Sequence, residues 1–138
     1  MERTDDETAR RVLEETRTWA VVGASEDPWR SSHSVAATLL ERGYDVIPVN
    51  PAYDTVLGLR CYKTLADVPR PVDVVDLFRR SDEAGAHVDE AVAIGAKVVW
   101  TQLGVFPDEA ALDRARAAGL TVVVSHCPAQ DIPRLLHR

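Results

Sequence analysis

The residues in this chain that are best suited to chemistry stand between an apolar segment and a helix-like stretch. They are small or polar, and one is basic: Gly23, Ala24, Ser25, Arg30, Ser31 and Ser32. Small residues let the backbone approach a phosphate closely, and a helix N-terminus offers N–H groups with a partial positive charge. We therefore expect this segment to bind a phosphate-bearing small molecule. An ordinary turn with Ser31 or Ser32 as the helix N-cap fits the same residues.

Two features of the sequence argue against a nicotinamide cofactor. The first turn has only the initial glycine, Gly23, of the G-x-G-x-x-G pattern that dinucleotide-binding turns use. An NAD site also usually places an acidic residue at the end of the second strand, where this sequence has Asn50 and Pro51. Asn50 can hydrogen-bond a ligand, and it is equally suited to hold a turn before a proline.

An aromatic ring and two guanidinium groups follow a third apolar segment, at Phe78, Arg79 and Arg80. The planar fork of an arginine matches phosphate oxygens, and a phenylalanine ring can lie against an adenine. This combination is typical of a nucleotide-binding edge. The alternative is a pair of solvated arginines that lead into a helix capped by Ser81.

Short valine-rich segments precede these candidates and have the character of strands buried on both faces: residues 19–23, 45–50, 72–77, 97–101 and 120–125. Helical patterns over 34–42, 82–94 and 110–118 each end at a glycine that a strand follows at once. This alternation predicts an α/β fold with right-handed crossovers. We expect a Rossmann-like, open, mainly parallel five-stranded sheet with helices on both faces.

Further elements are expected outside this alternation. The segment from Thr4 to Glu7 has the spacing of a capping box, which predicts an extra N-terminal helix within residues 1–17. Residues 64–67 suggest a short helix, and residues 51–62 are expected to form a loop.

The fourth strand is followed by Gln102, Leu103 and Gly104. The carboxyl ends of parallel strands open at one edge of a sheet, and ligands of such folds bind there. All the candidate residues named above are therefore expected to meet along a single rim.

The composition predicts one domain over residues 1–138, and it is compatible with a phosphate-rich small-molecule ligand held by helix N-termini and a few local arginines. The net charge of −6 argues against nucleic acid as a partner, because no basic stripe is present to neutralise phosphates.

The acidic, polar N-terminus and the strand-length apolar runs predict neither a signal peptide nor a membrane span. Two cysteines suit a reducing compartment, so we expect a cytoplasmic protein.

Metal binding and thiol chemistry have weak support in the sequence. His126 and Cys127 are adjacent, and no C-x-x-C or H-x-x-x-H spacing occurs, so no metal site is expected. Cys127 is open to two interpretations, a reactive thiol or a small buried residue in a turn bounded by Pro128.

The ordered motifs resemble the CoA-binding domain family of small bacterial proteins. The strings that carry the resemblance are residues 21–25, 28–35, 43–51, 74–80, 95–104 and 126–128, and the likeness spans about 18–136. That family is similar in turn to the N-terminal domain of the succinyl-CoA synthetase α subunit, whose phosphohistidine domain has no counterpart in this sequence. The resemblance implies coenzyme A as the cofactor and thirteen contact residues: Gly23, Ala24, Ser25, Arg30, Ser31, Ser32, Asn50, Pro51, Phe78, Arg79, Gln102, Leu103 and Gly104.

Three kinds of function are consistent with these residues. The first is a module that binds CoA or an acyl-CoA without catalysis of its own, because the sequence places no general base beside a nucleophile. The second is an NAD(P)-dependent or thiol-using enzyme on the same fold. The third is an interaction protein that senses CoA or serves an acyl-CoA enzyme, with the N-terminal helix and Trp19 packed either on a partner or, as we expect, on their own domain.

Overall fold

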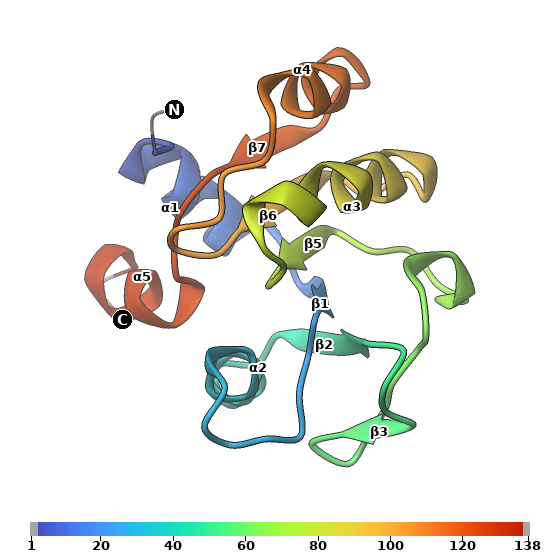
Figure 1. Ribbon diagram of the computed structural model, residues 1–138. Helices are drawn as coiled ribbons and strands as arrows, with labels where there is room; N and C mark the ends of the chain where they lie inside the picture. The colour runs from blue at the N-terminus through green and yellow to red at the C-terminus, as the bar shows by residue number, and fades with distance from the viewer. Residues whose placement is uncertain (1–2, 137–138) are drawn as a thin grey trace.

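Five parallel strands form the centre of the molecule, in the order β2-β1-β5-β6-β7 (Figure 1). The computed structural model describes residues 3–136. The strands are β1 (Thr18–Val22), β2 (Asp45–Val49), β5 (Val74–Leu77), β6 (Val98–Thr101) and β7 (Thr121–Val123). All the main strands predicted from the valine-rich segments are present, and every neighbouring pair runs parallel.

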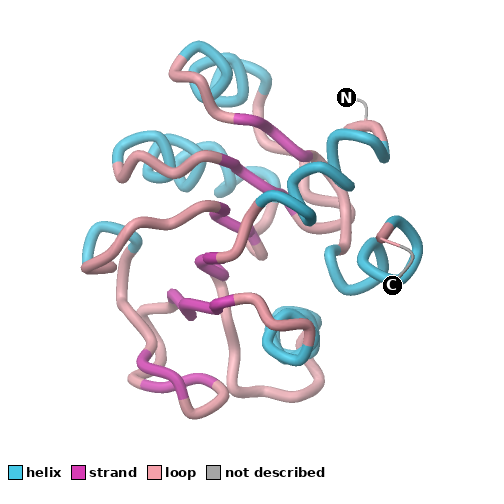
Figure 2. Tube along the Cα trace, turned by 180° about the vertical axis from the view of Figure 1, so that it is seen from behind, coloured by secondary structure: helices cyan, strands magenta, loops and turns pink. Residues whose placement is uncertain are grey.

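Helices cover both faces of this sheet, as Figure 2 shows when the sheet is seen nearly along its plane. One face carries α3 (Ser81–Ala93), α4 (Glu109–Ala117) and the short 3-10 helix η1 (Leu65–Asp67). The other face carries α1 (Asp6–Glu15), α2 (Ser31–Glu41) and α5 (Pro128–Leu135). None of the helices within residues 3–136 is long and apolar enough to cross a membrane.

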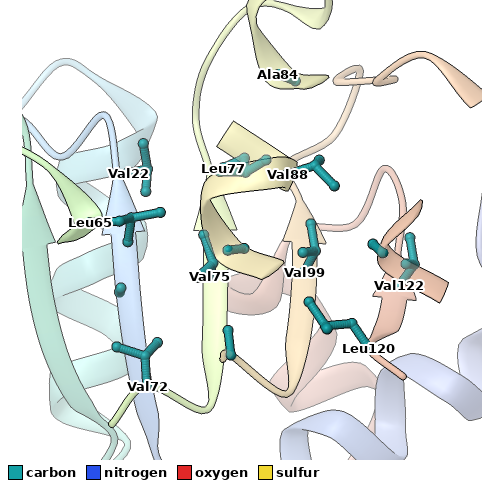
Figure 3. Packing of buried hydrophobic residues seen from close by; sticks show 14 of the residues in the cluster. Val22, Leu65, Val72, Val75, Leu77, Ala84, Val88, Val99, Leu120 and Val122 are labelled. Carbon is teal, nitrogen blue, oxygen red and sulfur yellow. The ribbon is translucent and has the colours of Figure 1, made fainter. Parts of the chain in front are cut away.

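Side chains alternate along each strand, and the alternation builds two separate cores. Val75, Leu77 and Val99 point toward α3, where they meet Ala84 and Val88 (Figure 3). The strand residues between them point to the opposite face. Because almost every strand position is buried on one side or the other, the strands appear in the sequence as continuous apolar runs rather than as alternating ones.

The second core is centred on two tryptophans. The rings of Trp19 and Trp100 lie 5.2 Å apart, and both side chains are fully buried. Each indole N–H is satisfied, since Trp19 donates to the Thr16 hydroxyl (3.0 Å) and Trp100 to the carbonyl of His126 (2.9 Å). Trp19 therefore packs within its own domain, as expected.

The chain departs from the predicted elements in three places. The N-cap of α1 is Asp5, which accepts the Thr8 N–H at 2.7 Å, so the expected capping box at Thr4 is wrong. The Thr4 hydroxyl instead accepts the N–H of Val124 (2.7 Å) at the end of the sheet. The expected loop 51–62 contains a small hairpin, β3 (Thr55–Val56) and β4 (Leu59–Arg60), and α5 was not predicted.

A chain of polar contacts joins the two terminal helices, α1 and α5. His126 is fully buried, with Nδ1 2.6 Å from Asp131 Oδ2 and Nε2 2.6 Å from the carbonyl oxygen of Thr4. Arg134 pairs with both Asp131 (2.8 Å) and Asp6 (2.7 Å). Burial opposes ionisation of Asp131 most strongly, but the contacts from His126 and Arg134 together lower the pKa of its carboxyl. The N-terminal helix is thus anchored to the domain.

Three glycines end α2, α3 and α4 in the left-handed region, as predicted (Gly43, Gly95 and Gly119). Gly23, at the end of β1, has a similar φ of +91° but a different environment. A Cβ at Gly23 would lie 2.7 Å from the carbonyl oxygen of Phe78, so the ends of β1 and β5 approach more closely than a side chain permits. A Cβ at Gly119 would meet nothing within 4 Å.

Asp76 is an exception to the apolar interior. It lies on the central strand β5 between Val21 and Trp100, and neither carboxyl oxygen has a hydrogen-bond partner among the described residues. Because the side chain is fully buried, desolvation raises the pKa of the Asp76 carboxyl well above its usual range. The sheet therefore accommodates this group best in its neutral form.

We expect Gly23→Ala to destabilise the fold more than Gly119→Ala does. Both variants force an alanine into a left-handed conformation, which costs about 1–2 kcal/mol, but only Gly23→Ala also meets a carbonyl oxygen at 2.7 Å. Urea denaturation of the two variants gives the free energies of unfolding to compare. Equal losses would show that the strand ends separate without cost.

We expect Asp76→Asn to stabilise the protein increasingly as the pH rises above about 4, the pKa of an aspartate in an unfolded chain. The folded-state pKa is raised, so the wild-type free energy of unfolding falls between the unfolded and the folded pKa. Each unit of pKa elevation corresponds to about 1.4 kcal/mol. The asparagine variant lacks this ionisation.

Asp73→Asn is the matched control for Asp76→Asn. Burial opposes ionisation of Asp73 most strongly, but N–H bonds from Thr18 and Arg17 and the ammonium of Lys97 together lower its pKa. Its loss should therefore weaken the fold at neutral pH and have little effect in acid. Melting temperatures of both variants and the wild type between pH 3 and 8 give the comparison. If the difference between Asp76→Asn and the wild type stayed constant over this range, the raised pKa of Asp76 would be contradicted.

Candidate functional site

A cleft of about 550 Å³ opens at the carboxyl ends of the strands, and we call it the rim cleft. Ten of the thirteen predicted contact residues line it: Gly23, Ser25, Arg30, Ser31, Ser32, Asn50, Phe78, Arg79, Gln102 and Leu103. They come from segments far apart in the sequence. The parallel sheet brings these segments to one edge, because each crossover returns the chain in the same direction.

The N-terminus of α2 forms one wall of the rim cleft. The helix begins at Ser31, three residues before the predicted start, so Ser31 and Ser32 belong to its first turn. Arg30 occupies the N-cap position and its side chain makes no capping hydrogen bond, so neither serine is the N-cap. The first N–H groups of an α-helix have no partner within the helix and are suited to an anion.

Hydrogen bonds hold the first loop in shape around Ser25. Its hydroxyl accepts the N–H of Asp27 at 3.0 Å and lies 3.3 Å from the hydroxyl of Tyr53. The ring nitrogen Nδ1 of His33 lies 2.8 Å from the Ser25 carbonyl oxygen. These contacts within the site fix the conformation of the loop, and the ring of His33 contributes one of them.

The arginines of the rim cleft differ in their pairing. Arg80 forms ion pairs with Asp82 (3.1 Å) and Glu83 (3.4 Å). Arg30 and Arg79 have no ion pair or side-chain hydrogen bond to any residue between 3 and 136. Two guanidinium groups therefore face the cleft with their positive charge uncompensated by a carboxylate, an arrangement that favours an anionic ligand.

Asn50 spans two loops of the site. Its amide nitrogen donates to the carbonyl of Ala24 at 2.8 Å, and its amide oxygen accepts the N–H of Ala52 at 2.9 Å. Both ends of the amide thus hold the loop together, which fits the structural role that the sequence allowed. Asn50 also lines the rim cleft, so a ligand contact from its side chain stays a prediction.

Three predicted contact residues do not line the rim cleft. Ala24, which belongs to the first loop, is fully buried. Pro51 lies on the wall of a smaller neighbouring cavity. Gly104 is exposed, and its N–H donates to the Ser125 hydroxyl at 3.0 Å. A ligand contact from these three residues stays a prediction.

Three residues that line the cleft were not predicted at all: Ala52, Tyr53 and Val105. Arg80, a candidate of the third strand end that is not among the thirteen contacts, also lines the cleft. Ala52 and Tyr53 belong to the segment that was predicted to be a featureless loop. Its position directly after a strand end was the signal that could have identified them. Gln102 also lines the cleft, and its amide oxygen is buried without a partner among the described residues.

Neither cysteine lines the rim cleft as the structure describes it. Cys61 and Cys127 are both buried free thiols, and burial raises the pKa of Cys61. A buried thiol with a raised pKa has little thiolate and is a poor nucleophile. No group of three or more metal-ligating side chains occurs within the described range, residues 3–136.

Comparisons with known proteins show the family and the fold of this chain. A family model described as a CoA binding domain matches residues 17–133. The uncharacterized protein YneT of Bacillus subtilis is 35% identical over 116 residues, which are 84% of this chain and 85% of YneT. A hypothetical protein from Pyrococcus horikoshii has a solved structure with a TM-score of 0.89 and 40% identity, covering 99% of both chains.

Larger enzymes contain a related segment. The ADP-forming acetate–CoA ligase of Methanocaldococcus jannaschii is 31% identical over 55 residues, 40% of this chain but 8% of the ligase. A dinucleotide-forming acetyl-coenzyme A synthetase from Candidatus Korarchaeum cryptofilum superposes with a TM-score of 0.71 at 31% identity, over 81% of this chain and 27% of the synthetase. The resemblance found in the sequence is thereby confirmed, and the chain belongs to the CoA-binding domain family.

Proposed function

We propose that the rim cleft binds coenzyme A and that this protein carries out no chemistry on it. Two guanidinium groups without a carboxylate partner support this proposal most directly. They are those of Arg30 and Arg79, which line the same cleft as the first turn of α2. CoA carries several phosphates, which need concentrated positive charge. Its adenine ring suits the half-buried Phe78, which lines the same cleft.

We propose that there is no catalysis because the cysteines and histidines that could act as nucleophile or base are buried or already bonded within the protein. A nucleophile needs an adjacent base and access to the ligand. Both cysteines are buried and neither lines the cleft, His126 is held by Asp131 and Thr4, and His33 bonds to the Ser25 carbonyl. The thiol-using enzyme is therefore not favoured.

A nicotinamide cofactor is not favoured either. The ribose of NAD is usually held by an acidic residue at the end of the second strand. In this protein both ends of the Asn50 amide are bonded to the backbone, at Ala24 and Ala52. The second strand end is therefore occupied by a loop contact, whereas the phosphate-binding features of the cleft remain open.

A thermal-shift measurement with CoA, NAD, NADP and ATP tests this function. We expect CoA to raise the melting temperature and NAD and NADP to leave it unchanged. A ligand at a hundredfold excess over its Kd stabilises the folded state by about 2.7 kcal/mol. A shift with NAD(P) but not with CoA, or with none of the four, would contradict the proposal. A shift with ATP as large as that with CoA would show that the pantetheine arm contributes nothing.

We expect Arg30→Ala and Arg79→Ala each to weaken CoA binding by about tenfold or more, because a hydrogen bond to a charged group contributes about 1.5–3 kcal/mol. Isothermal titration calorimetry gives the affinities. Arg114→Ala is the matched control, since Arg114 pairs with Asp89 (3.0 Å), away from the cleft, and its loss should leave CoA affinity unchanged. Equal affinities for the wild type and both cleft variants would place the phosphates elsewhere.

A further inference from the structure

A second cavity of about 250 Å³ lies beside the rim cleft, and we call it the side pocket. Its apolar wall is formed by Val22, Val49 and Leu65, which are 2%, 3% and 1% exposed. All three belong to the core on the α3 face of the sheet. The side pocket therefore lies across the strand ends from α2, whose first turn lines the rim cleft.

The two cavities adjoin at the ends of β1 and β2. Arg79 lines both of them. Gly23 lines the rim cleft, and its neighbour Val22 lines the side pocket. Asn50 likewise lines the rim cleft, and its neighbour Val49 lines the side pocket. A ligand that passes Arg79 consequently leaves a polar, cationic environment and enters an apolar one.

The polar groups around the side pocket already have partners. The Lys63 ammonium donates to the Tyr53 carbonyl at 3.0 Å and pairs with Asp54 at 3.1 Å. Nδ1 of His87 lies 2.5 Å from a carboxylate oxygen of Glu90. Arg79, at the boundary, is the exception. The interior of the pocket thus suits a group that is small, uncharged and apolar.

We propose that the side pocket binds the acyl group of a short-chain acyl-CoA, so that the protein prefers an acylated CoA to the free thiol. This proposal rests on the proposed binding of CoA in the rim cleft. Phosphates held by Arg30, Arg79 and the α2 N-terminus leave the uncharged pantetheine arm to pass beside Arg79 into the side pocket. The acyl chain then lies against Leu65 and the two valines.

The test compares the affinities of CoA, acetyl-CoA, butyryl-CoA and succinyl-CoA by isothermal titration calorimetry. Each buried CH₂ contributes about 0.8 kcal/mol, so butyryl-CoA should bind on the order of tenfold more tightly than acetyl-CoA. Succinyl-CoA should gain less than butyryl-CoA, because beyond Arg79 its terminal carboxylate would lie against Val22, Val49 and Leu65, and the nearby Lys63 and His87 already have carboxylate partners.

Two variants test whether the preference for butyryl-CoA arises in the side pocket. Leu65→Phe fills the pocket from its floor, and Thr64→Trp covers it from an exposed position that leaves the core intact. Both should abolish the preference for butyryl-CoA while free CoA binds as before. Leu135→Phe, on the opposite face of the sheet, is the matched control and should keep the preference.

The outcomes separate the two proposals. Equal binding of CoA and butyryl-CoA by the wild type would overturn the acyl pocket and leave the CoA site standing. A preference for succinyl-CoA, or a butyryl preference that survives both Leu65→Phe and Thr64→Trp, would also overturn it. No binding of any CoA species would overturn the proposed function itself.

Discussion

A parallel sheet must be covered on both faces, and this requirement organises the whole molecule. The helices divide between the faces, with α3 and α4 on one side and α1, α2 and α5 on the other. Each crossover returns the chain in the same direction, so every strand opens its carboxyl end at the same edge. The rim cleft and the side pocket are both products of that edge, one on each side of it.

The charges of the protein are distributed in a way that suits a small anion. The chain as a whole has a net charge of −6, and several arginines, such as Arg70, Arg114 and Arg134, are compensated by carboxylates. Arg30 and Arg79 are left uncompensated where the first turn of α2 begins. A ligand with a few phosphates needs only this local positive charge, whereas a nucleic acid needs an extended basic surface.

Buried polar groups in this protein fall into two kinds. His126 and Asp131 satisfy each other, and through Thr4 and Arg134 they link α5 to the segment that begins α1, so their burial contributes to the attachment of the terminal helices. Asp76 lies on β5, between the strands that contain Trp19 and Trp100. It has no hydrogen bond among the described residues, and its burial opposes ionisation. The first arrangement stabilises the fold at neutral pH, and the second reduces its stability there.

Much of the fold followed from local patterns. Valine-rich runs and glycines after helices predicted five parallel strands and three crossover helices, because strand burial and helix termination depend on neighbouring residues in the chain. The motifs also identified ten residues that line the rim cleft. The hairpin at residues 55–60 and α5 lack a long periodic pattern, so local reasoning could not find them.

Other properties depend on contacts between residues distant in the sequence, and only the tertiary structure decided them. Arg79 and Arg80 are adjacent and chemically identical, yet only Arg80 faces carboxylates. Asn50 became a loop contact because Ala24 reached it across the rim. The side pocket exists because η1, α3 and two strand ends leave a space that no single segment encodes. Sequence patterns report which residues will be buried, whereas pairing and cavity shape depend on which segments meet in space.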